Sequence, residues 1–324
     1  MISRTPHVRW QSQTDAKVVA LGGGHGLAAT LSALRRLPTN LTGVVTVADN
    51  GGSSGRIRSE LGGLPPGDLR MALAALCGDD EWGRTWADVL QHRFASEGPM
   101  HGHAVGNLLI AGIWDLLGDN VDGLDLVGQL LGAQGRVLPM ASIPLTIEAD
   151  VRLDTSPDQL TRVTGQVEVA STDGRVVNVW LDPADPPACP QAVEAIDAAD
   201  WVVIGPGSWF TSVLPNLLVP GIRAALSRTT AKRILVLNLG EQVGETAGLT
   251  PQDHLEVLAS HAPELHFDYV LADTGMVDEA GILASAAKSL GAELISVHVS
   301  KGPGSVLHDP LRLAAAFHHM MNQA

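Results

Sequence analysis

The sequence contains few cysteines, and it has no apolar run as long as a membrane span. Cys77 and Cys189 are its only cysteines, so it lacks the closely spaced cysteines of a disulfide-stapled secreted domain. The apolar runs are all shorter than the roughly 18–20 residues that a transmembrane helix needs. Residues 1–16 lack the apolar core of a signal peptide and are predicted to form a flexible leader. We therefore expect a cytoplasmic protein without a membrane span.

Basic residues are also scarce. The 324 residues include 21 Lys and Arg against 35 Asp and Glu, which gives a formal net charge of −14. Nucleic-acid-binding proteins usually carry a dense basic patch, and the sequence has no such cluster of Lys and Arg. One tyrosine and four phenylalanines also leave few side chains on which bases could stack. No nucleic-acid partner is predicted, and any bound phosphate has to be held by backbone amides and a few side chains.

The sequence does contain a regular alternation of short apolar strands and helical segments. Six runs rich in β-branched residues have the character of buried parallel strands: 18–21, 44–48, 201–205, 233–239, 268–273 and 293–299. Segments with apolar residues at helical spacing lie among them: 27–37, 68–76, 81–95, 105–117 and 310–322. This order predicts an α/β fold with a doubly wound, mostly parallel Rossmann-like sheet, in a single domain over residues 17–324. Such sheets bind ligands at the carboxyl ends of their strands, so the loops that follow strands are the candidate site.

The middle of the chain has a different pattern. Short alternating segments are separated by turn residues, at 137–140, 145–151, 165–169 and 176–181. A proline-rich loop over 182–190 then closes this region. We predict a small antiparallel β patch inserted over about residues 137–185.

The first candidate loop follows the first strand. Four of its residues are candidate phosphate ligands: Gly23, Gly24, His25 and Gly26. Residues 24–29 satisfy the pattern G-x-G-x-x-A, and Asp49 follows at the end of the next strand, as in dinucleotide-binding folds. Glycines let the backbone approach a pyrophosphate, and the next helix offers unpaired N–H groups. His25 is predicted to donate to a phosphate oxygen, with its protonation coupled to binding. A tight turn without a ligand stays an alternative.

A second loop, rich in glycine and serine, directly follows the second strand. Its candidate ligands are Asp49, Asn50, Gly51, Gly52, Ser53 and Ser54. Their carboxylate, amide and hydroxyl groups suit sugar or phosphate oxygens, and an ordinary dinucleotide enzyme does not need such a loop. The sequence Asp-Asn-Gly-Gly is also common in turns, so a turn that binds no ligand stays an alternative.

Three further candidates lie on predicted helices: Asp68, Arg70 and Asn107. Asp68 follows a stiff Pro-Pro-Gly turn, where it either caps the helix or faces a ligand. Arg70 lies one turn in and is predicted to point at a bound anion. Asn107 is on an otherwise apolar helix, and a buried amide needs partners, which favours a ligand or a neighbouring loop. A His-x-His pair at 101–103 lacks further ligands at metal-binding spacing, so no metal site is predicted.

A third loop follows the strand at 201–205 and leads toward a helix. Its candidate ligands are Gly205, Gly207, Ser208, Thr211 and Ser212. The amides and hydroxyls of this loop are predicted to form an oxyanion nest. No Gly-Lys-Ser/Thr follows, so this is not a P-loop. Together the three loops predict a phosphorylated ligand.

Six motifs occur in one order along the chain: GGGHGL, ADNGGSSGRIR, LPPGDLR, GHAVGNLLIAG, IGPGSWFTSVLPNLL and NLGEQVGETAGLTPQDHLE. Together they resemble the gluconeogenesis factor, or YvcK-like, family. The chain is more distantly similar to 2-phospho-L-lactate transferase (CofD). This resemblance runs from about Lys17 to the C-terminal helix.

The resemblance implies a CofD-like α/β fold in a cytoplasmic protein that binds UDP-sugars, such as UDP-N-acetylglucosamine or UDP-glucose. It also implies a role in cell shape and cell-wall synthesis during gluconeogenic growth, without an established reaction. Some members of the family are phosphorylated, so a Ser/Thr protein kinase is a candidate partner, and a homo-oligomer is expected. Tyr269 lies in the region of the family's uridine-binding aromatic residue, so it is expected either to face the base or to pack at the rim at the start of its strand. Asn238 is expected either to reach a sugar hydroxyl or to brace its loop.

Two positions depart from the family pattern. Asn50 stands where a second aspartate is common, which argues against a divalent metal and a transferase reaction. Leu307 replaces the arginine of an Arg-His-Asp-Pro motif, so nucleotide affinity or specificity is expected to differ, with Lys301 or Arg312 as substitutes. The preferred function is a UDP-sugar-binding regulator without turnover. A metal-dependent transferase and an NAD(P)-binding oxidoreductase, the latter suggested by G-x-G-x-x-A and Asp49, stay as alternatives.

Overall fold

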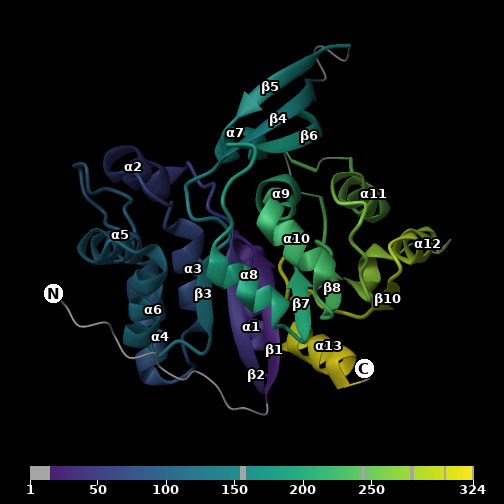
Figure 1. The fold of residues 1–324 in the computed structure, drawn as a ribbon, viewed down its shortest axis with the longest axis horizontal. Coiled ribbons are helices and arrows are strands. Elements are labelled where there is room, and N and C mark those ends of the chain that lie inside the picture. The colour runs from purple at the N-terminus through teal and green to yellow at the C-terminus, as the bar shows by residue number, and fades with distance from the viewer. Residues whose placement is uncertain are drawn as a thin grey trace.

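The computed structural model describes residues 15–153, 158–241, 245–246, 248–277, 281–302 and 304–322. Its main sheet has seven parallel strands in the order β10-β9-β8-β7-β1-β2-β3 (Figure 1). The bounds of these strands are β1 Ala16–Gly22, β2 Thr39–Val45, β3 Arg136–Pro139, β7 Trp201–Ile204, β8 Lys232–Val236, β9 Tyr269–Ala272 and β10 Glu293–Ser296. The predicted doubly wound α/β sheet is confirmed. Residues 1–14 of the predicted leader lie outside the described residues, and β1 begins at Ala16.

Strand β1 is where the chain changes its direction of travel across the sheet. β2 pairs with one side of β1 and β7 with the other, both in parallel. The chain moves outward through β2 and β3, returns to β7, and then moves outward through β8, β9 and β10. Residues Val18 to Leu21 are at most 2% exposed, as expected for a strand with both faces covered. The carboxyl ends of β1 and β7 therefore form the switch point where such sheets bind ligands.

Helices cover the two faces of the sheet (Figure 1). Right-handed crossovers on opposite sides of β1 place the connecting helices on opposite faces. One group is α1 (Gly24–Leu34), α3 (Gly67–Leu76) and α13 (Pro310–Asn322), and another is α8 (Pro190–Asp197), α9 (Leu214–Leu218) and α10 (Pro220–Arg228). The remaining longer helices are α2 (Gly52–Leu61), α4 (Glu81–Gln91), α5 (Val105–Leu117), α6 (Asn120–Leu131), α11 (Pro251–His261) and α12 (Ile282–Ser289). The predicted helices are confirmed, although α4 ends at Gln91 rather than at residue 95.

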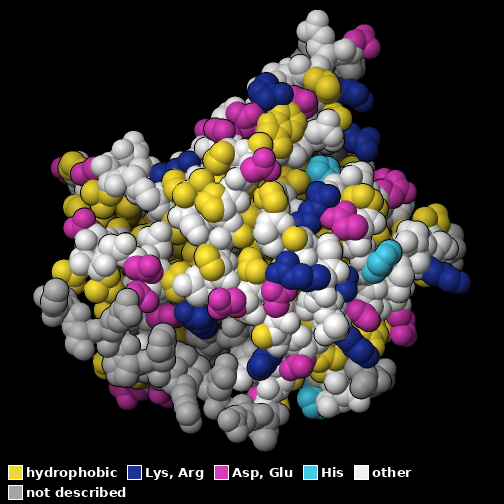
Figure 2. All heavy atoms as spheres, viewed as in Figure 1, with side chains coloured by type: hydrophobic (Ala, Val, Ile, Leu, Met, Phe, Trp, Pro, Cys, Tyr) yellow, Lys and Arg dark blue, Asp and Glu magenta, His cyan; other side chains and the backbone are white. Residues whose placement is uncertain are grey.

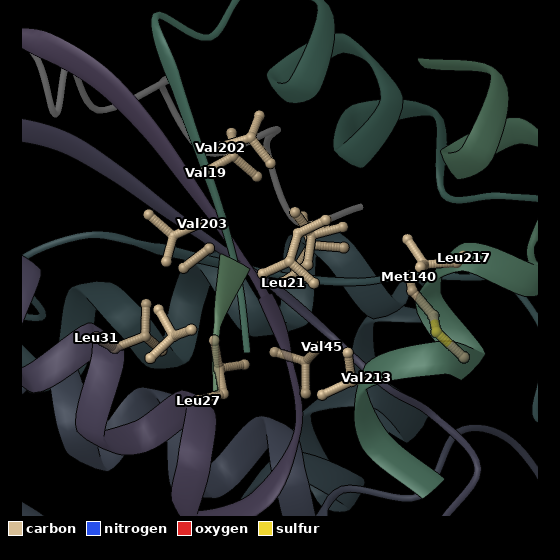
Figure 3. Packing of buried hydrophobic residues seen from close by; sticks show 14 of the residues in the cluster. Val19, Leu21, Leu27, Leu31, Val45, Met140, Val202, Val203, Val213 and Leu217 are labelled. Atoms are coloured by element: carbon tan, nitrogen blue, oxygen red, sulfur yellow. The ribbon is translucent and has the colours of Figure 1, made fainter. Parts of the chain in front are cut away.

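The hydrophobic core surrounds the central strands (Figure 3). Leu27 and Leu31 lie one helical turn apart on α1, so both point toward the sheet. Val213 and Leu217 belong to the segment that follows β7, and Figure 3 shows Leu217 beside Met140. All five side chains are at most 1% exposed. This packing fixes the positions at which β1 and β7 end, and with them the loops that follow.

The inserted β patch is smaller than predicted. It consists of β4 (Thr146–Leu153), β5 (Leu160–Thr164) and β6 (Gly174–Asp182), antiparallel in the order β5-β4-β6. Residues 137–140 were predicted to belong to it, but β3 pairs in parallel with β2 in the main sheet, because its apolar residues are buried there. Residues 165–169 were predicted as a strand, but α7 (Gln166–Ala170) begins after Gly165, whose φ of +110° favours glycine. Alternating apolar and polar residues over 167–169 imitate a strand over this short range.

Charged side chains of both signs are interspersed over the face in Figure 2, with no single basic field. This agrees with the acidic composition of the chain. Across the described part of the chain, no helix has both the length and the apolar character needed to cross a membrane.

Candidate functional site

The glycine turn after β1 touches the loop after β7. A Cβ atom at Gly26 would lie 2.2 Å from the carbonyl oxygen of Pro206, so no larger residue fits without backbone movement. Gly24 has a φ of +56°, which starts the tight passage from β1 into α1. Thr30 of α1 donates to the carbonyl of Gly205 at 3.0 Å and holds the two loops together. Gly26 is therefore required by this close approach and Gly24 is favoured by its positive φ, with or without a ligand.

The N-cap residue of α1 is Gly23, which has no side chain to cap the helix, and the carboxylate of Asp68 in α3 accepts from the N–H of Gly24, the first residue of the helix. By contrast, Asp80, Asp119 and Thr250 cap α4, α6 and α11 through hydrogen bonds to the first-turn amides. A helix start without such a cap presents N–H groups and a partial positive charge, which together suit an anion. His25 is exposed on this first turn, as a contact to a ligand requires.

Two carboxylates meet beside this turn. Asp49 accepts from the N–H of Gly51 at 2.8 Å, and a Cβ atom at Gly67 would lie 2.7 Å from its Oδ2 atom. Asp68 lies in the first turn of α3 and accepts a backbone hydrogen bond from Gly24. Burial, and then the charge of Asp49, raise the pKa of Asp68 to about 7, against the Gly24 hydrogen bond and Arg70. Because Pro66 holds the cap position of α3, Asp68 does not act as a helix cap.

A cavity of about 240 Å³ opens between the loop after β2, the start of α3, Arg93 and Asn107. Arg70 lines it and is only 3% exposed. Its Nε atom donates to Oδ1 of Asn107 at 2.9 Å, while its Nη1 atom is buried without a hydrogen-bond partner. Burial, and then the charge of Arg93, lower the pKa of Arg70 to about 10. Arg70, which was predicted to point at a bound anion, thus lines a cavity, and its Nη1 atom has no hydrogen-bond partner.

A network of hydrogen bonds holds Arg70 in place. Nδ2 of Asn107 donates to Oγ of Ser53 at 3.1 Å and approaches Oγ of Ser54 at 3.4 Å. Oγ of Ser53 also bonds with Nδ1 of His103 at 3.0 Å. His101, in contrast, is exposed and accepts from the N–H of Ser96. The two histidines therefore point to different partners, and in the described residues no three His, Cys, Asp or Glu side chains gather as metal ligands.

Asn50 holds the inserted patch rather than facing the cavity. Its Oδ1 atom accepts from the N–H of Val167 at 3.1 Å, and its Nδ2 atom donates to Oε2 of Glu168 at 2.8 Å. Both partners belong to α7, which also contacts the loop after β7 through Gln166. One donor and one acceptor position of the Asn50 amide are therefore used within the protein, which gives Asn50 a structural role, and its contact with a ligand stays a prediction.

The loop after β7 does not offer the predicted oxyanion nest. Oε1 of Glu245 accepts from the N–H groups of Phe210 and Thr211, each at 2.7 Å, at the start of the π-helix η1 (Trp209–Val213). The protein's own buried carboxylate thus occupies those amides, and burial raises its pKa. Asn238 exchanges two 2.9 Å hydrogen bonds with the backbone of Gly207, so it braces the loop.

The other predicted residues of this loop have separate roles. Ser208 also hydrogen-bonds Glu245. The Oγ atom of Ser212 lies near Gly23, so it borders the glycine turn. Ser212 therefore places a hydroxyl group beside the turn into α1.

The comparisons with known proteins agree with this geometry. The family model described as 2-phospho-L-lactate transferase CofD matches residues 18–300 of this chain. The chain belongs to the CofD family. Among its relatives, a putative gluconeogenesis factor of Mycobacterium leprae is 56% identical over 92% of this chain and 84% of the relative. A gluconeogenesis factor of Halalkalibacterium halodurans is 41% identical over 75% of this chain and 73% of its own length. The crystal structure of a UPF0052 family member from Bacillus halodurans has a TM-score of 0.84 at 33% identity, over 95% of this chain and all of the other.

One predicted contact of this CofD-family chain lies at the wrong edge of the sheet. Tyr269 is the first residue of β9 and stacks on Trp201, the first residue of β7, with ring centroids 6.3 Å apart. Both rings therefore lie at the amino ends of the parallel strands, opposite the glycine turn. Tyr269 lies at the start of β9, as expected. Because this is the amino end of the strand, Tyr269 cannot contact a ligand at the carboxyl edge of the sheet.

The structure also shows the surroundings of Leu307, which stands in place of the arginine of the family's Arg-His-Asp-Pro motif. Leu307 is 52% exposed, and Lys301 is exposed as well. Both lie in a hairpin that is closed by the antiparallel bridge between Ser300 and His308. Arg312, named as a possible substitute for the missing arginine, donates to the carbonyl of Ser300 at 2.6 Å and so braces the hairpin.

Sequence reasoning missed Arg93, which lines the cavity beside Arg70. It falls inside the predicted helix 81–95, but α4 ends before it and the chain turns back to pair Arg93 with Ala104. No motif marks such a residue, because only the return of the chain brings it to Arg70.

Proposed function

We propose that this protein is a gluconeogenesis factor that binds a UDP-sugar, UDP-N-acetylglucosamine or UDP-glucose, in the cytoplasm. It acts as a regulatory protein that supports cell shape and cell-wall synthesis during gluconeogenic growth, without turnover of the bound sugar. The observation that carries the binding function is the glycine turn that leads into α1 at the β1/β7 switch point, where no side chain of the N-cap residue Gly23 covers the helix start. The names of relatives up to 56% identical support the link to gluconeogenesis.

The diphosphate is the part of the ligand that this geometry suits. Peptide N–H groups of the first turn and the helix dipole stabilise negative charge without a lysine or arginine. His25 is exposed on the same turn and donates to a phosphate oxygen, and the bound anion in turn favours its protonated form. Ser212 lies beside Gly23 and supplies a hydroxyl group.

A metal-dependent transferase stays a second candidate, because Asp49 and Asp68 lie beside the turn on which the diphosphate would rest. Two neighbouring carboxylates favour binding of a divalent cation with phosphate oxygens. The regulator is preferred because the position next to Asp49 is Asn50, whose amide is used by α7. Magnesium dependence of ligand binding separates the two candidates.

Thermal unfolding with UDP-N-acetylglucosamine, UDP-glucose, GDP and NAD, each with and without magnesium, tests the proposal. A ligand of the native state at about 100 times its Kd adds about 2.7 kcal/mol and raises Tm. We expect a rise with the UDP-sugars that does not require magnesium. A rise with magnesium only would favour the transferase, and a rise with NAD alone would refute the proposal.

Replacing His25 with Ala tests the diphosphate contact. We expect weaker UDP-sugar binding by isothermal titration calorimetry, and a smaller dependence of affinity on pH than in the wild type. His266→Ala is the matched control, since His266 is an exposed histidine near the amino end of β9. Equal affinity for His25→Ala and wild type at every pH would remove His25 from the site.

The proposal also includes a Ser/Thr protein kinase as a partner, which phosphopeptide mapping tests. It further includes a homo-oligomer, which light scattering tests.

A further inference from the structure

We propose that Gln166, in the short helix α7 of the inserted patch, is a further contact for the diphosphate of the bound nucleotide sugar. Its side-chain amide donates to a phosphate oxygen of the ligand that rests on the start of α1. This inference rests on the proposed function and deepens it, because it adds a residue from the inserted patch to the same site.

Helix α7 touches both loops that flank the carboxyl end of β1. On one side, Asn50 in the loop after β2 is bonded to the N–H of Val167 and to the carboxylate of Glu168. On the other side, Nε2 of Gln166 donates to the carbonyl of Thr211, in the π-helix η1 after β7, at 3.4 Å. β1 lies between β2 and β7 in the sheet, so α7 crosses beyond the end of β1. Figure 1 shows α7 between the inserted patch and the main sheet.

The anchor of α7 on the loop after β7 adjoins the glycine turn. Thr211 directly precedes Ser212, whose Oγ atom lies 3.2 Å from the position that a Cβ atom would take at Gly23. The turn itself stays accessible, since His25 on the first turn of α1 is exposed. A diphosphate on this first turn is therefore bordered by the segment to which the Gln166 side chain reaches.

The amide of Gln166 has a donor to offer. Its Nε2 atom carries two N–H groups, and the carbonyl of Thr211 accepts one of them. That hydrogen bond is long, because N–H···O distances in proteins are most often about 2.9–3.0 Å. Hydrogen bonds to a charged acceptor are shorter and roughly twice as strong as neutral ones. A phosphate oxygen is therefore a better acceptor for this half-buried amide than the carbonyl is.

The backbone of α7 is held in place without a ligand. The N–H of Gly165, just before the helix, donates to the carbonyl of Ile147 in β4 at 2.8 Å. Val167 packs on the loop after β2, since a Cβ atom at Gly51 would lie 2.7 Å from its Cγ2 atom. The carboxylate of Glu168 is bonded to the same loop. A donor on a fixed helix loses little conformational freedom when the ligand binds.

Two substitutions of Gln166 test the contact, with UDP-N-acetylglucosamine and UDP as probes in calorimetry at about pH 8, where a glutamate side chain is ionised. Both probes carry the diphosphate, so we expect Gln166→Ala to weaken each about tenfold. Gln166→Glu places a negative charge against the phosphates and is expected to bind at least about tenfold more weakly than Gln166→Ala. If Gln166 only braced Thr211, both variants would lose the same N–H donor and bind alike.

Gln91→Glu is the matched control. Gln91 is the exposed last residue of α4, so this variant adds the same charge away from the glycine turn. We expect it to bind both probes as the wild type does. If it binds as weakly as Gln166→Glu, the effect is one of net charge and the contact is overturned.

The outcomes keep this inference and the proposed function apart. Wild-type affinity in Gln166→Ala, or equal affinity in the two Gln166 variants, would overturn the contact while binding by the wild type still supports the proposed function. Absence of UDP-N-acetylglucosamine binding by the wild type would overturn both.

Discussion

Replacing Asp68 with Asn removes the carboxyl group that lies between the glycine turn and the Arg70 cavity. In the wild type, burial and then the charge of Asp49 raise the pKa of Asp68 from 3.8 to about 7. The folded protein therefore binds this proton more tightly than the unfolded chain does. The stability gained from the neutral carboxyl is fully present below about pH 3.8 and is lost as the pH rises through about 7. The Asn variant has no such proton to lose.

The size of the effect follows from the shift in pKa. Each pKa unit corresponds to about 1.36 kcal/mol in the free energy of unfolding. Between about pH 5 and pH 8, the linkage relation for these two pKa values gives a loss of about 2.6 kcal/mol. Asp68 keeps partial contact with solvent, and water screens its interactions. We therefore expect the wild type to lose about 1–2 kcal/mol more than Asp68→Asn over this range.

Urea unfolding of the two ligand-free proteins across this pH range measures the difference. Other titrating groups, such as the buried Glu245, are present in both proteins and cancel in the comparison. Asp49→Asn removes one cause of the raised pKa of Asp68, so it should flatten the dependence on pH. Asp115→Asn, on the exposed side of α5, controls for the loss of one negative charge. A stability difference between the wild type and Asp68→Asn that stays constant with pH would refute the reasoning.

Three further predictions concern the loops at the carboxyl edge. Gly26→Ala places a methyl group against the carbonyl of Pro206, so thermal unfolding should show a loss of about 1–3 kcal/mol, and an unchanged Tm would contradict the contact. Burial lowers the pKa of His308 to about 4, so stability is lost as pH falls from about 6.5, and His308→Gln should reduce that acid sensitivity in urea unfolding. Asn50→Ala breaks two hydrogen bonds to α7, so amide exchange over residues 166–170 should become faster while the main sheet is unchanged.

The parallel sheet could be predicted because its strands are marked by continuous apolar runs. β7, for example, is the four residues Trp201–Ile204, all buried, and the run in the sequence coincides with it. The predictions were wrong for two short segments. α7 has alternating residues like a strand, and only the positive φ of Gly165 and the contact with Asn50 make it a helix. β3 was assigned to the inserted patch, because a four-residue run does not say which sheet it joins.

The candidate site was predictable in part. Glycines at 24 and 26, the carboxylate of Asp49 and the helix-borne Arg70 follow from local motifs, and the structure brings these elements together beside the cavity. The partners of their polar atoms were not predictable. Glu245 fills the amides of the third loop, although it is separated from Phe210 by 35 residues.

The sequence by itself determined the order of strands and helices and the presence of glycine loops after them, because periodicity and backbone freedom are local properties of the chain. Only the tertiary structure decided that Glu245 occupies two amides of the third loop, that Tyr269 lies at the opposite edge, and that Arg93 joins Arg70. Those outcomes depend on which buried donor and acceptor meet across the fold, and burial makes each such pairing exclusive.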